Sequence, residues 1–387
     1  MVPVTRVRLA VVGLGGIAQS VHLPLVARRW DLFELTALAD LSADRAARLG
    51  QRYGVPVERR FADLDALLAA VTGGLAVDGV VLATSGSHGD ALLRLARAGL
   101  PVLCEKPVAL SVAEVDAVEQ ELRDRGRDPR TAVLVGYMKE YDPAVARARA
   151  ELAGRRVRAV TVEVLHPADD AQLRFARLLP PAGDVDPAVL HAAQRPTVEA
   201  VDRAVGAGAS AWLRTTYTNV VLGSIVHDVS LLRHLVGGVT AIDSAAHWGG
   251  VPGSVQLTGH VGAGARLHLG WHFIADYPDY RETITVHHEQ GSVSLTFAVP
   301  YLLNVATELV LTGRAADLGG EARTTLRWAQ EEAFENELAA FHAMVTEGAA
   351  PSSGLAEGRA DLRTGQRVLA ALARARGEPV AGEAGRP

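Results

Sequence analysis

The sequence predicts an α/β protein with two domains: an N-terminal doubly wound parallel sheet, and a C-terminal α/β domain on a large, mostly antiparallel open sheet. Over the first 135 or so residues, continuous apolar strands alternate with helices, which is typical of a parallel sheet covered on both faces. From about residue 155 the strands instead alternate polar and apolar residues, as in an antiparallel sheet with one exposed face. A chain of 387 residues, 49% of them hydrophobic, is long enough for two such domains.

The N-terminal domain, taken as residues 1–140, begins with a strand. We expect its strands at residues 7–15, 33–40, 77–84, 100–107 and 130–138. We expect its helices at residues 17–29, 41–54, 88–99 and 111–126, with the apolar segment 63–71 before the third strand. Gly54 is expected to end the second helix.

In the C-terminal domain, taken as residues 141–378, we expect strands at 158–166, 254–261, 265–273, 281–288 and 291–297. A Pro-, Ala- and Asp-rich stretch at about 167–215 contains two weak helical segments, 170–179 and 186–194, and we interpret it as an insertion or an irregular cap. Helices at 327–348 and 359–377 close the domain, and residues 379–387 are expected to be a disordered tail.

Composition and charge argue against several classes of protein. The formal net charge is −5, and no cluster of Lys and Arg marks a nucleic-acid-binding surface. No stretch approaches the roughly 18 to 20 uninterrupted apolar residues of a membrane span, and glycines break the apolar run near the N-terminus. The single cysteine, Cys104, excludes an internal disulfide framework and is interpreted as a core residue. No grouping of His, Cys and Asp has zinc-site spacing, so we expect a soluble cytoplasmic protein that needs no metal.

A glycine-rich turn between the first strand and the first helix predicts a dinucleotide site. The motif Gly13-x-Gly15-x-x-Ala18 is common by itself, but its place in the first βα turn strengthens the prediction. The backbone groups expected to hold the pyrophosphate at the helix N-terminus are those of Gly13, Gly15, Gly16 and Ile17. The Ser/Gly-rich loop after the strand at 77–84 is expected to contact the cofactor through Thr84, Ser85 and His88. Helix capping by Ser87 also explains that loop.

Asp40 ends the second strand. An acid at this position hydrogen-bonds the adenosine ribose and repels a 2′-phosphate. Because Leu41 rather than an arginine follows it, NAD is favoured over NADP. The alternative is that Asp40 caps the helix that begins near Ser42.

The stretch PVLCEKPVAL (101–110) places a charged pair, Glu105 and Lys106, at the end of another strand at the same edge of the sheet. A lysine there would point at the nicotinamide and the substrate, where its ammonium stabilises negative charge on the reacting oxygen. Glu105 would fix the strand end, and both residues are expected to contact the cofactor. The alternative is a solvated turn, with Pro107 opening the next helix.

With these residues the chain resembles the glucose–fructose oxidoreductase, inositol dehydrogenase and rhizopine-catabolism (Gfo/Idh/MocA) oxidoreductases. The resemblance rests on the glycine motif, Asp40, the TSGSH loop, the EKP turn and the stretches 136–143 (GYMKEYDP), 227–238, 280–295 and 335–348. It implies a Rossmann domain that binds NAD(P) and a second α/β domain that binds the substrate and forms oligomers. The implied reaction is oxidation or reduction of a hydroxyl or carbonyl on a sugar, a cyclitol or a derivative of one.

The resemblance also implies a second catalytic group, because proton transfer accompanies hydride transfer. His227 matches the family histidine that acts with the EKP lysine, although a polar histidine on a helix face is the alternative. Many members have an aspartate one helical turn earlier, where this chain has Gly223, and on a helix Asp228 points about 100° away. Either a larger substrate or a group from the insertion is expected to fill the space beside His227. Tyr217 and Asn219 lie nearest in sequence.

The substrate contacts that we expect are Lys139, Tyr141, Tyr217, Asn219 and Asp228, with a solvated Lys139 as the alternative. The predicted function is that of an NAD-dependent dehydrogenase or ketoreductase acting on CH–OH groups, and the long insertion hints at a nucleotide- or glycoside-linked sugar. The alternatives are an NAD-dependent glycosidase that uses transient oxidation and a non-catalytic NAD-binding regulator on the same fold. A homodimer or homotetramer is expected from the resemblance.

Overall fold

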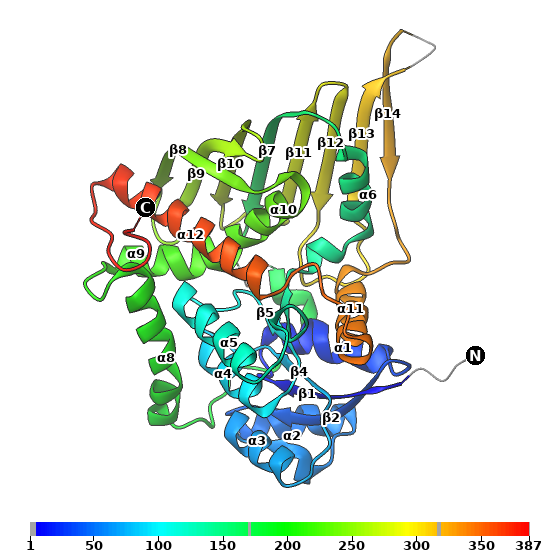
Figure 1. Ribbon diagram of the computed structural model, residues 1–387, viewed down its shortest axis with the longest axis vertical. Helices are drawn as coiled ribbons and strands as arrows, with labels where there is room; N and C mark the ends of the chain where they lie inside the picture. Colours follow the sequence, from blue (N-terminus) through cyan, green and yellow to red (C-terminus); the bar gives the residue numbers. More distant parts are fainter. Residues whose placement is uncertain (1–4, 169–171, 316–318, 387) are drawn as a thin grey trace. The chain divides into compact units, whose positions relative to one another are not determined.

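The computed structural model describes residues 5–168, 172–315 and 319–386, and the chain divides into two compact units (Figure 1). Unit 1 comprises Met1–Gly136, Ala176–Ala204 and Glu337–Ala360, and unit 2 comprises Tyr137–Phe175, Val205–Asn336 and Asp361–Pro387. The sequence indicated one boundary near residue 140, whereas two later segments also belong to unit 1. Phe341, for example, packs so closely on Gly79 that a Cβ at that glycine would lie 2.9 Å from its ring.

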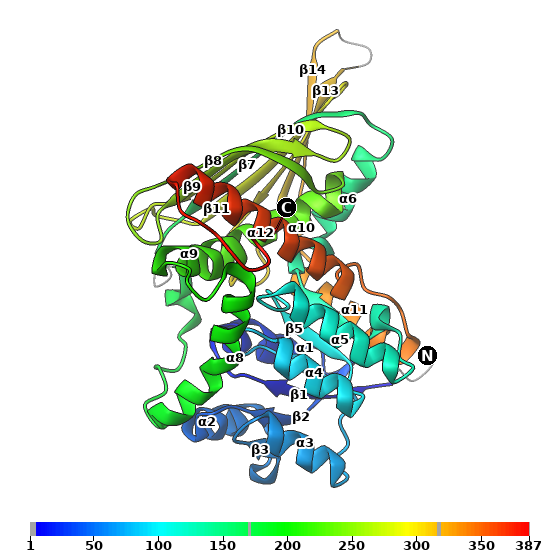
Figure 2. The ribbon, with the colours of Figure 1, turned by 60° about the vertical axis from the view of Figure 1, so that its left-hand side comes forward.

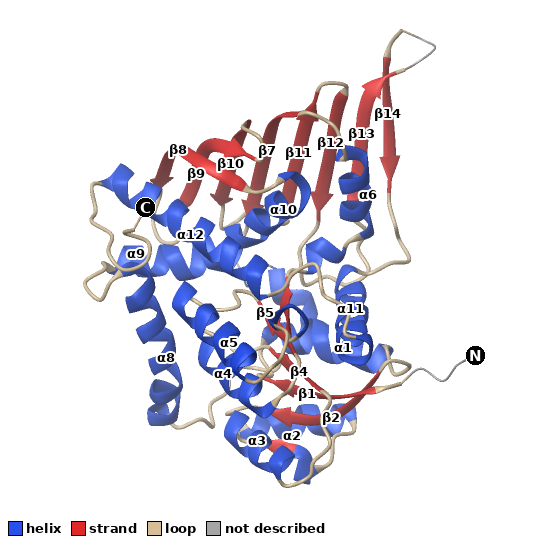
Figure 3. Cartoon of the chain, viewed as in Figure 1, coloured by secondary structure: helices blue, strands red, loops and turns tan. Residues whose placement is uncertain are grey.

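Unit 1 contains a six-stranded parallel sheet, and the predicted doubly wound fold is confirmed. The strand order is β3-β2-β1-β4-β5-β6. The strands are β1 (Val7–Val12), β2 (Phe33–Ala39), β3 (Arg60–Phe61), β4 (Gly79–Leu82), β5 (Val102–Glu105) and β6 (Val133–Gly136). The central strands are buried almost throughout, as their continuous apolar runs indicated. Helices lie on both sides of this sheet (Figure 3).

The helices of unit 1 lie close to their expected positions. They are η1 (Ala18–His22), α1 (Leu23–Arg28), α2 (Ala43–Tyr53), η2 (Val57–Arg59), α3 (Leu64–Thr72), α4 (Gly89–Ala98), α5 (Val112–Asp124), η3 (Pro129–Thr131) and most of α11 (Ala333–Glu347). Gly54 ends α2 in the left-handed conformation, with φ of 73°, as the sequence predicted. The first expected helix differs in one respect, because it opens with the π-helical turn η1.

Unit 2 contains an eight-stranded sheet in the order β14-β13-β12-β11-β7-β10-β9-β8. Its strands are β7 (Val157–His166), β8 (Val239–Trp248), β9 (Ser254–Val261), β10 (Ala265–Phe273), β11 (Arg281–His288), β12 (Gly291–Phe297), β13 (Glu308–Arg314) and β14 (Glu321–Leu326). Among the strands that the structure describes in this sheet, β7 and β10 alone pair in parallel, so the predicted mostly antiparallel sheet is confirmed. Strands β8, β13 and β14 escaped prediction. The edge strands β8 and β14 are largely exposed and lack apolar alternation.

The helical elements of unit 2 are η4 (Met138–Tyr141), α6 (Pro143–Leu152), α9 (Ala211–Thr215), η6 (Thr216–Ile225), α10 (Val226–Val236) and most of α12 (Leu355–Arg376). α6 packs on β12 and β13, and α10 packs on α6 and β8. Buried alternate residues of β7, namely Val160, Val162 and Val164, contribute to the core of this unit. No helix among the described residues has the length and apolar character needed to cross a membrane.

The stretch interpreted as an insertion (167–215) divides between the units. Residues 170 and 171 of its first expected helix lie outside the described residues, and the part of that helix that the structure describes includes the short turn η5 (Arg174–Ala176). The second expected helix is much longer than predicted, since α8 runs over Pro187–Val205.

The expected disordered tail also differs in the structure. Pro387 lies outside the described residues, but the Ala381 N–H donates to the Val205 carbonyl at 3.3 Å and Ala384 is buried. The backbone pairing and this burial give residues 379–386 a defined path.

Candidate active site

The glycine turn after β1 is shaped by two glycines with different surroundings. Gly13 has a φ of +87°, and a Cβ there would lie 2.6 Å from the backbone nitrogen of Thr84, so only glycine lets the turn meet the loop after β4. Gly15 has no atom within 4 Å of a Cβ position, which leaves its backbone open to a pyrophosphate. Gly16 and Ile17 begin the helix after this turn, so their N–H groups lie at its N-terminus.

Asp40 links the glycine turn to the start of α2. Its Oδ2 accepts the N–H of Leu14 at 2.7 Å, and its Oδ1 accepts the N–H of Ser42 at 2.8 Å. Arg45 is close as well, with Nη1 3.4 Å from Oδ1. The N-cap of α2 is Ser42, whose hydroxyl accepts the N–H of Arg45, so the alternative that Asp40 is the cap is wrong. That Asp40 binds the ribose stays a prediction.

The loop after β4 contains Thr84, Ser85 and His88. Ser85 is exposed and Thr84 is half-buried. The His88 ring is buried, with Nε2 2.8 Å from the Thr84 carbonyl oxygen and Nδ1 2.8 Å from that of Pro107. His88 therefore ties this loop to the turn after β5, and Thr84 and Ser85 are the members of the group that can reach a bound nucleotide directly.

Glu105 is buried at the end of β5 and holds the strand end before Lys106. Its Oε1 lies 2.7 Å from Nε2 of His22, at the end of η1, and its Oε2 accepts the N–H of Lys106 at 3.3 Å. Burial alone would raise the pKa of the Glu105 carboxyl, but the hydrogen bond with His22 and the charges of His22, Lys106 and His88 hold that pKa below its ordinary value. An ionised carboxylate is thus fixed beside the half-buried Lys106. No motif in the sequence marked His22 as its partner.

Unit 2 contains a buried group of polar side chains that we name the Lys139 cluster: Lys139, Asp228, Tyr280 and Glu282. Lys139 of η4 forms an ion pair with Oε2 of Glu282, and the Tyr280 hydroxyl donates to the same oxygen. Lys139 is 4% exposed, and Asp228 and Glu282 are each 1% exposed. The alternative of a solvated Lys139 is therefore wrong. The sequence singled out Lys139 and Asp228, but missed the other two; an acid in the inward-facing register of β11 was the available signal.

Burial and charge set the protonation of this cluster. Burial first, and then the charge of Glu282, raise the pKa of Asp228 well above its ordinary value. Burial and the same acids also raise the pKa of the Tyr280 hydroxyl. The raised pKa of Asp228 favours a protonated carboxyl beside the ion pair of Lys139 and Glu282. Such a group can store a proton and can hydrogen-bond hydroxyls.

His227 precedes Asp228 at the start of α10 and is half-buried. Its ring meets that of Tyr137 edge-on, with 6.5 Å between centroids. The preceding segment Thr216–Ile225 (η6) is a π-helix and not the regular helix that the sequence indicated. A π turn contains more residues than an α turn, so the regular helical spacing that the sequence indicated does not hold in η6.

The remaining predicted substrate contacts are dispersed. Tyr217 is fully buried within η6, whereas Asn219 is exposed and its Oδ1 accepts the Thr218 hydroxyl at 2.9 Å. Tyr141 is half-buried at the end of η4. Tyr217 and Asn219 thus lie on different faces of η6, and Ser224 of the same segment accepts the indole N–H of Trp271 at 2.8 Å.

An aromatic group adjoins the Lys139 cluster through Tyr280. The His166 ring lies 5.1 Å from that of Trp271, 6.3 Å from that of Phe273 and 5.7 Å from that of Tyr280, centroid to centroid. Aromatic surfaces next to a few fixed polar groups are typical of small-molecule sites.

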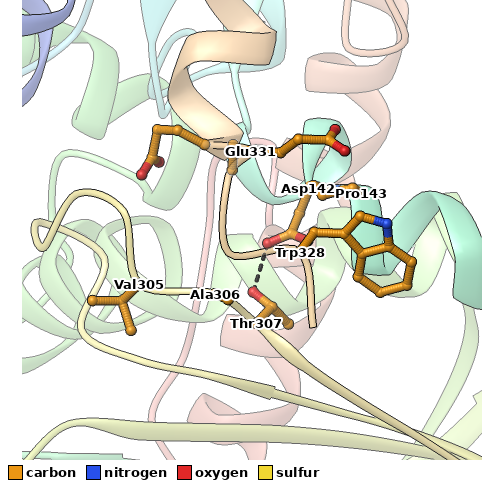
Figure 4. A pocket seen from close by; sticks show the side chains of 9 residues that line it. Asp142, Pro143, Val305, Ala306, Thr307, Trp328 and Glu331 are labelled. Carbon is orange, nitrogen blue, oxygen red and sulfur yellow. Dashed lines mark hydrogen bonds between the residues drawn. The ribbon is translucent and has the colours of Figure 1, made fainter. Parts of the chain in front are cut away.

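The described residues of unit 2 form, among others, two pockets. The one in Figure 4 is lined by Asp142, Pro143, Val305, Ala306, Thr307, Trp328, Glu331, Glu332 and Ala333. Its Asp142 carboxylate is already occupied by the Thr307 hydroxyl at 2.5 Å and the Ala144 N–H at 2.8 Å. The other pocket includes Tyr280 and Phe297, and Lys139 Nζ lies 5.0 Å from the centroid of the Phe297 ring. Of these two pockets, the second includes Tyr280 and so adjoins the Lys139 cluster.

Comparisons with known proteins agree with this arrangement. Residues 7–131 match the family model described as "Oxidoreductase family, NAD-binding Rossmann fold". Inositol 2-dehydrogenase of Rhizobium meliloti (strain 1021) is 26% identical over 358 residues, which cover 89% of this chain and 91% of that protein. The aldose-aldose oxidoreductase of Caulobacter crescentus superposes with a TM-score of 0.70 at 20% identity, covering 96% of this chain and 99% of that one.

A further solved structure, UDP-N-acetylglucosamine 3-dehydrogenase of Acidithiobacillus ferrooxidans, superposes with a TM-score of 0.67 at 21% identity and covers 95% of this chain and 98% of that one. The two structural matches support the fold, while the family model and the inositol 2-dehydrogenase extend the likeness to sequence. The predicted dehydrogenase class is confirmed by the class of these relatives. Residues 7–131 thus match the NAD-binding domain of the Gfo/Idh/MocA oxidoreductases, and the comparisons support the predicted likeness to that family.

Proposed function

We propose that the protein transfers a hydride between NAD and a hydroxyl or carbonyl carbon of a sugar, a cyclitol or a sugar derivative. The proposal rests above all on Glu105, an ionised, buried acid that fixes the strand end before Lys106 at the carboxyl edge of the parallel sheet. Ligands of doubly wound sheets bind outside that edge. Burying the charge of Glu105 beside Lys106 is unfavourable. A reaction on a ligand bound at this edge would explain why the pair is kept there.

The residues of unit 1 fit a nicotinamide dinucleotide. Gly15 leaves room for the pyrophosphate, and the N–H groups of Gly16 and Ile17 lie at a helix N-terminus. Asp40 offers a carboxylate at the end of β2 for the ribose. When bound, such a cofactor accepts or supplies the hydride.

Two side chains are assigned to the chemistry. The Lys106 ammonium donates a hydrogen bond to the reacting oxygen and stabilises the negative charge that develops there. His227 removes the hydroxyl proton during oxidation and returns it during reduction. Lys106 and Lys139 are the only lysines in a sequence whose 39 Lys and Arg residues are otherwise arginine. A compact ammonium that can lose its proton differs from a guanidinium that cannot, which supports a chemical role where lysine is kept.

The substrate class is inferred from the relatives and from unit 2. The related proteins are named for inositol, aldoses and UDP-N-acetylglucosamine, and we extend this polyhydroxylated class to the present chain. The pocket with Tyr280 and Phe297, next to the Lys139 cluster, suits a ring with several hydroxyls. Lys139 and Asp228 would then orient the substrate through Tyr280, while Tyr141, Tyr217 and Asn219 stay predictions.

The test is an absorbance assay at 340 nm with NAD and NADP tested separately against inositols, free hexoses, nucleotide sugars and aminocyclitols. We expect turnover with NAD that falls by about a thousandfold in both Lys106→Ala and His227→Ala, with NAD affinity changed only a few-fold. His191→Ala, at an exposed position of α8, is the matched control and should keep full activity. Wild-type turnover by Lys106→Ala would refute the proposal, and cleavage of a glycoside without net NADH formation would favour the glycosidase.

A further inference from the structure

Residues 176–204, here named the strap, cross the nucleotide-binding edge of unit 1. Leu178 lies 3.5 Å from a Cβ position on Gly16 in the glycine turn, and the Leu179 N–H donates to Oε1 of Gln19 at 2.9 Å. Farther along, Thr197 accepts the Ser87 N–H at 3.0 Å in the loop after β4. In Figure 2 the chain reaches α2 just before α8 begins, and α8 then runs beside α4 and α5. The strap thus contacts the same loops from which the cofactor site is built.

Asp184 of the strap occupies the N-terminus of α2. Its Oδ1 accepts the Ser42 hydroxyl at 2.7 Å, and its Oδ2 accepts the Asp44 N–H at 2.9 Å. Ser42 also donates its N–H to Asp40, the acid expected to bind the ribose and here named the ribose acid. Ser42 therefore bridges two carboxylates, that of Asp40 and that of Asp184. The hydrogen bonds from Asp44 and Ser42 lower the pKa of Asp184, and it is therefore ionised at neutral pH.

Without Asp184, the same place would be a set of anion donors. The Ser42 hydroxyl, the Asp44 N–H and the Arg45 guanidinium all lie within three residues of one another along the chain, at the positive end of a helix. Arg45 Nε is buried and has no hydrogen-bond partner within the part of the chain that the structure describes. An arginine near the ribose acid is what accommodates the 2′-phosphate of NADP in this fold. Asp40 by itself therefore leaves the choice of cofactor open.

We propose that Asp184 determines the preference for NAD over NADP by filling, with its own carboxylate, the donor site in which a 2′-phosphate would bind. The inference rests on the proposed nicotinamide chemistry. A 2′-phosphate approaching this site meets two carboxylates, Asp40 and Asp184, and finds the Ser42 hydroxyl and the Asp44 N–H already engaged. Like charges brought together in this way discriminate against a ligand more strongly than missing contacts do. The strap supplies this discrimination from a part of the chain more than a hundred residues away from the ribose acid.

Direct binding of NAD and NADP to the full-length protein, followed by tryptophan fluorescence or calorimetry, tests the proposal without any substrate. For Asp184→Asn and Asp184→Ala we expect NADP affinity to rise by about tenfold or more, while NAD affinity changes less than about threefold. Thr197→Val is the matched control for a loosened strap, because it removes the contact with Ser87 and no charge. It should shift both affinities alike and leave their ratio unchanged.

Equal changes of the NAD and NADP affinities in the Asp184 variants would overturn the inference. Asp184 would then only hold the strap against the N-terminus of α2. Wild-type protein that binds NADP as tightly as NAD would also overturn it, while leaving the proposed dehydrogenase intact. Failure of the wild-type protein to bind either dinucleotide would refute the proposed function itself. The three results are separable in one titration series.

Discussion

The two units hold their buried acids in opposite states. In unit 1, Glu105 is ionised because His22 and nearby positive charges outweigh its burial. In unit 2, burial and the neighbouring charge of Glu282 raise the pKa of Asp228 and favour its protonated form. Unit 1 therefore presents fixed charge at the edge of its sheet, whereas unit 2 neutralises its charges internally. The first arrangement suits binding of a charged cofactor, and the second suits orientation and proton exchange with a neutral polyol.

The units also differ in what supports their polar groups. In unit 1 the backbone supplies the partners of two polar side chains, because Asp40 accepts the N–H groups of Leu14 and Ser42, and His88 contacts two carbonyls. In unit 2 the partners are side chains from η4, α10 and β11. Single substitutions should therefore lower the free energy of unfolding for different reasons in the two units.

The largest effect is expected from breaking the ion pair of the Lys139 cluster. Lys139→Met should lower the free energy of unfolding by about 3–5 kcal/mol, because it leaves Glu282 buried without its cation. The double variant Lys139→Met/Glu282→Gln should recover a substantial part of that loss, since it removes the uncompensated charge. Urea unfolding of the three proteins measures both numbers.

Arg147→Met is the control for that measurement. Its ion pair with Glu151 lies on the surface of α6 in the same unit, so its loss should cost less than about 0.5 kcal/mol. A Lys139→Met variant as stable as this control would show that the cluster carries no buried charge, and the contrast between the units would fail.

In unit 1 a matched pair of glycines separates folding from binding. Gly13→Ala should lower the free energy of unfolding by about 2–4 kcal/mol, because φ is +87° and a Cβ would lie 2.6 Å from the Thr84 nitrogen. Gly15→Ala should change stability by less than about 1 kcal/mol, because the space around it is open. It should nevertheless weaken NAD binding by about tenfold or more, since the methyl group stands where the pyrophosphate approaches. Thermal unfolding and NAD titration of both variants provide the test, which equal stabilities would contradict.

Much of the fold was predictable because its patterns are local. The buried strands of unit 1 are continuous apolar runs, and Gly13 and Gly54 mark turns that only a residue tolerant of positive φ can form. The missed elements lack such signals: β3 has two residues, and β14 is almost wholly exposed. The strap lies in the stretch interpreted as an insertion or an irregular cap. Its contact with the nucleotide-binding edge was not predictable, because nothing in its sequence shows that Asp184 meets the helix that begins after Ser42.

The residues of the candidate site also divide into those with a local sequence signal and those without one. Asp40, Glu105 and Lys106 stand at strand ends, where topology alone brings side chains to one edge of a sheet. His22 and Glu282 were missed because each becomes part of a site only through a side chain far away in the sequence. The π-helix before His227 was also out of reach, since no residue pattern distinguishes η6 from the α-helix that continues it.

The smallest effect, and the most direct comparison of the units, is a difference in pH dependence between Glu105→Gln and Asp228→Asn. Glu105 has a folded pKa below its ordinary value of 4.5, so its contribution to stability is present at neutral pH and lost as the pH falls through the folded pKa. The loss of stability in Glu105→Gln relative to the wild type should therefore be largest near pH 7 and become smaller below about pH 4.5. Asp228 has a folded pKa well above its ordinary value of 3.8, so the wild type loses stability as the pH rises toward that folded pKa. Because asparagine resembles the protonated acid, the free energy of unfolding of Asp228→Asn should increase relative to that of the wild type over the same rise in pH. Urea unfolding between about pH 4 and pH 8 measures both differences, and slopes of the same sign would show that the two units do not hold their acids in opposite states.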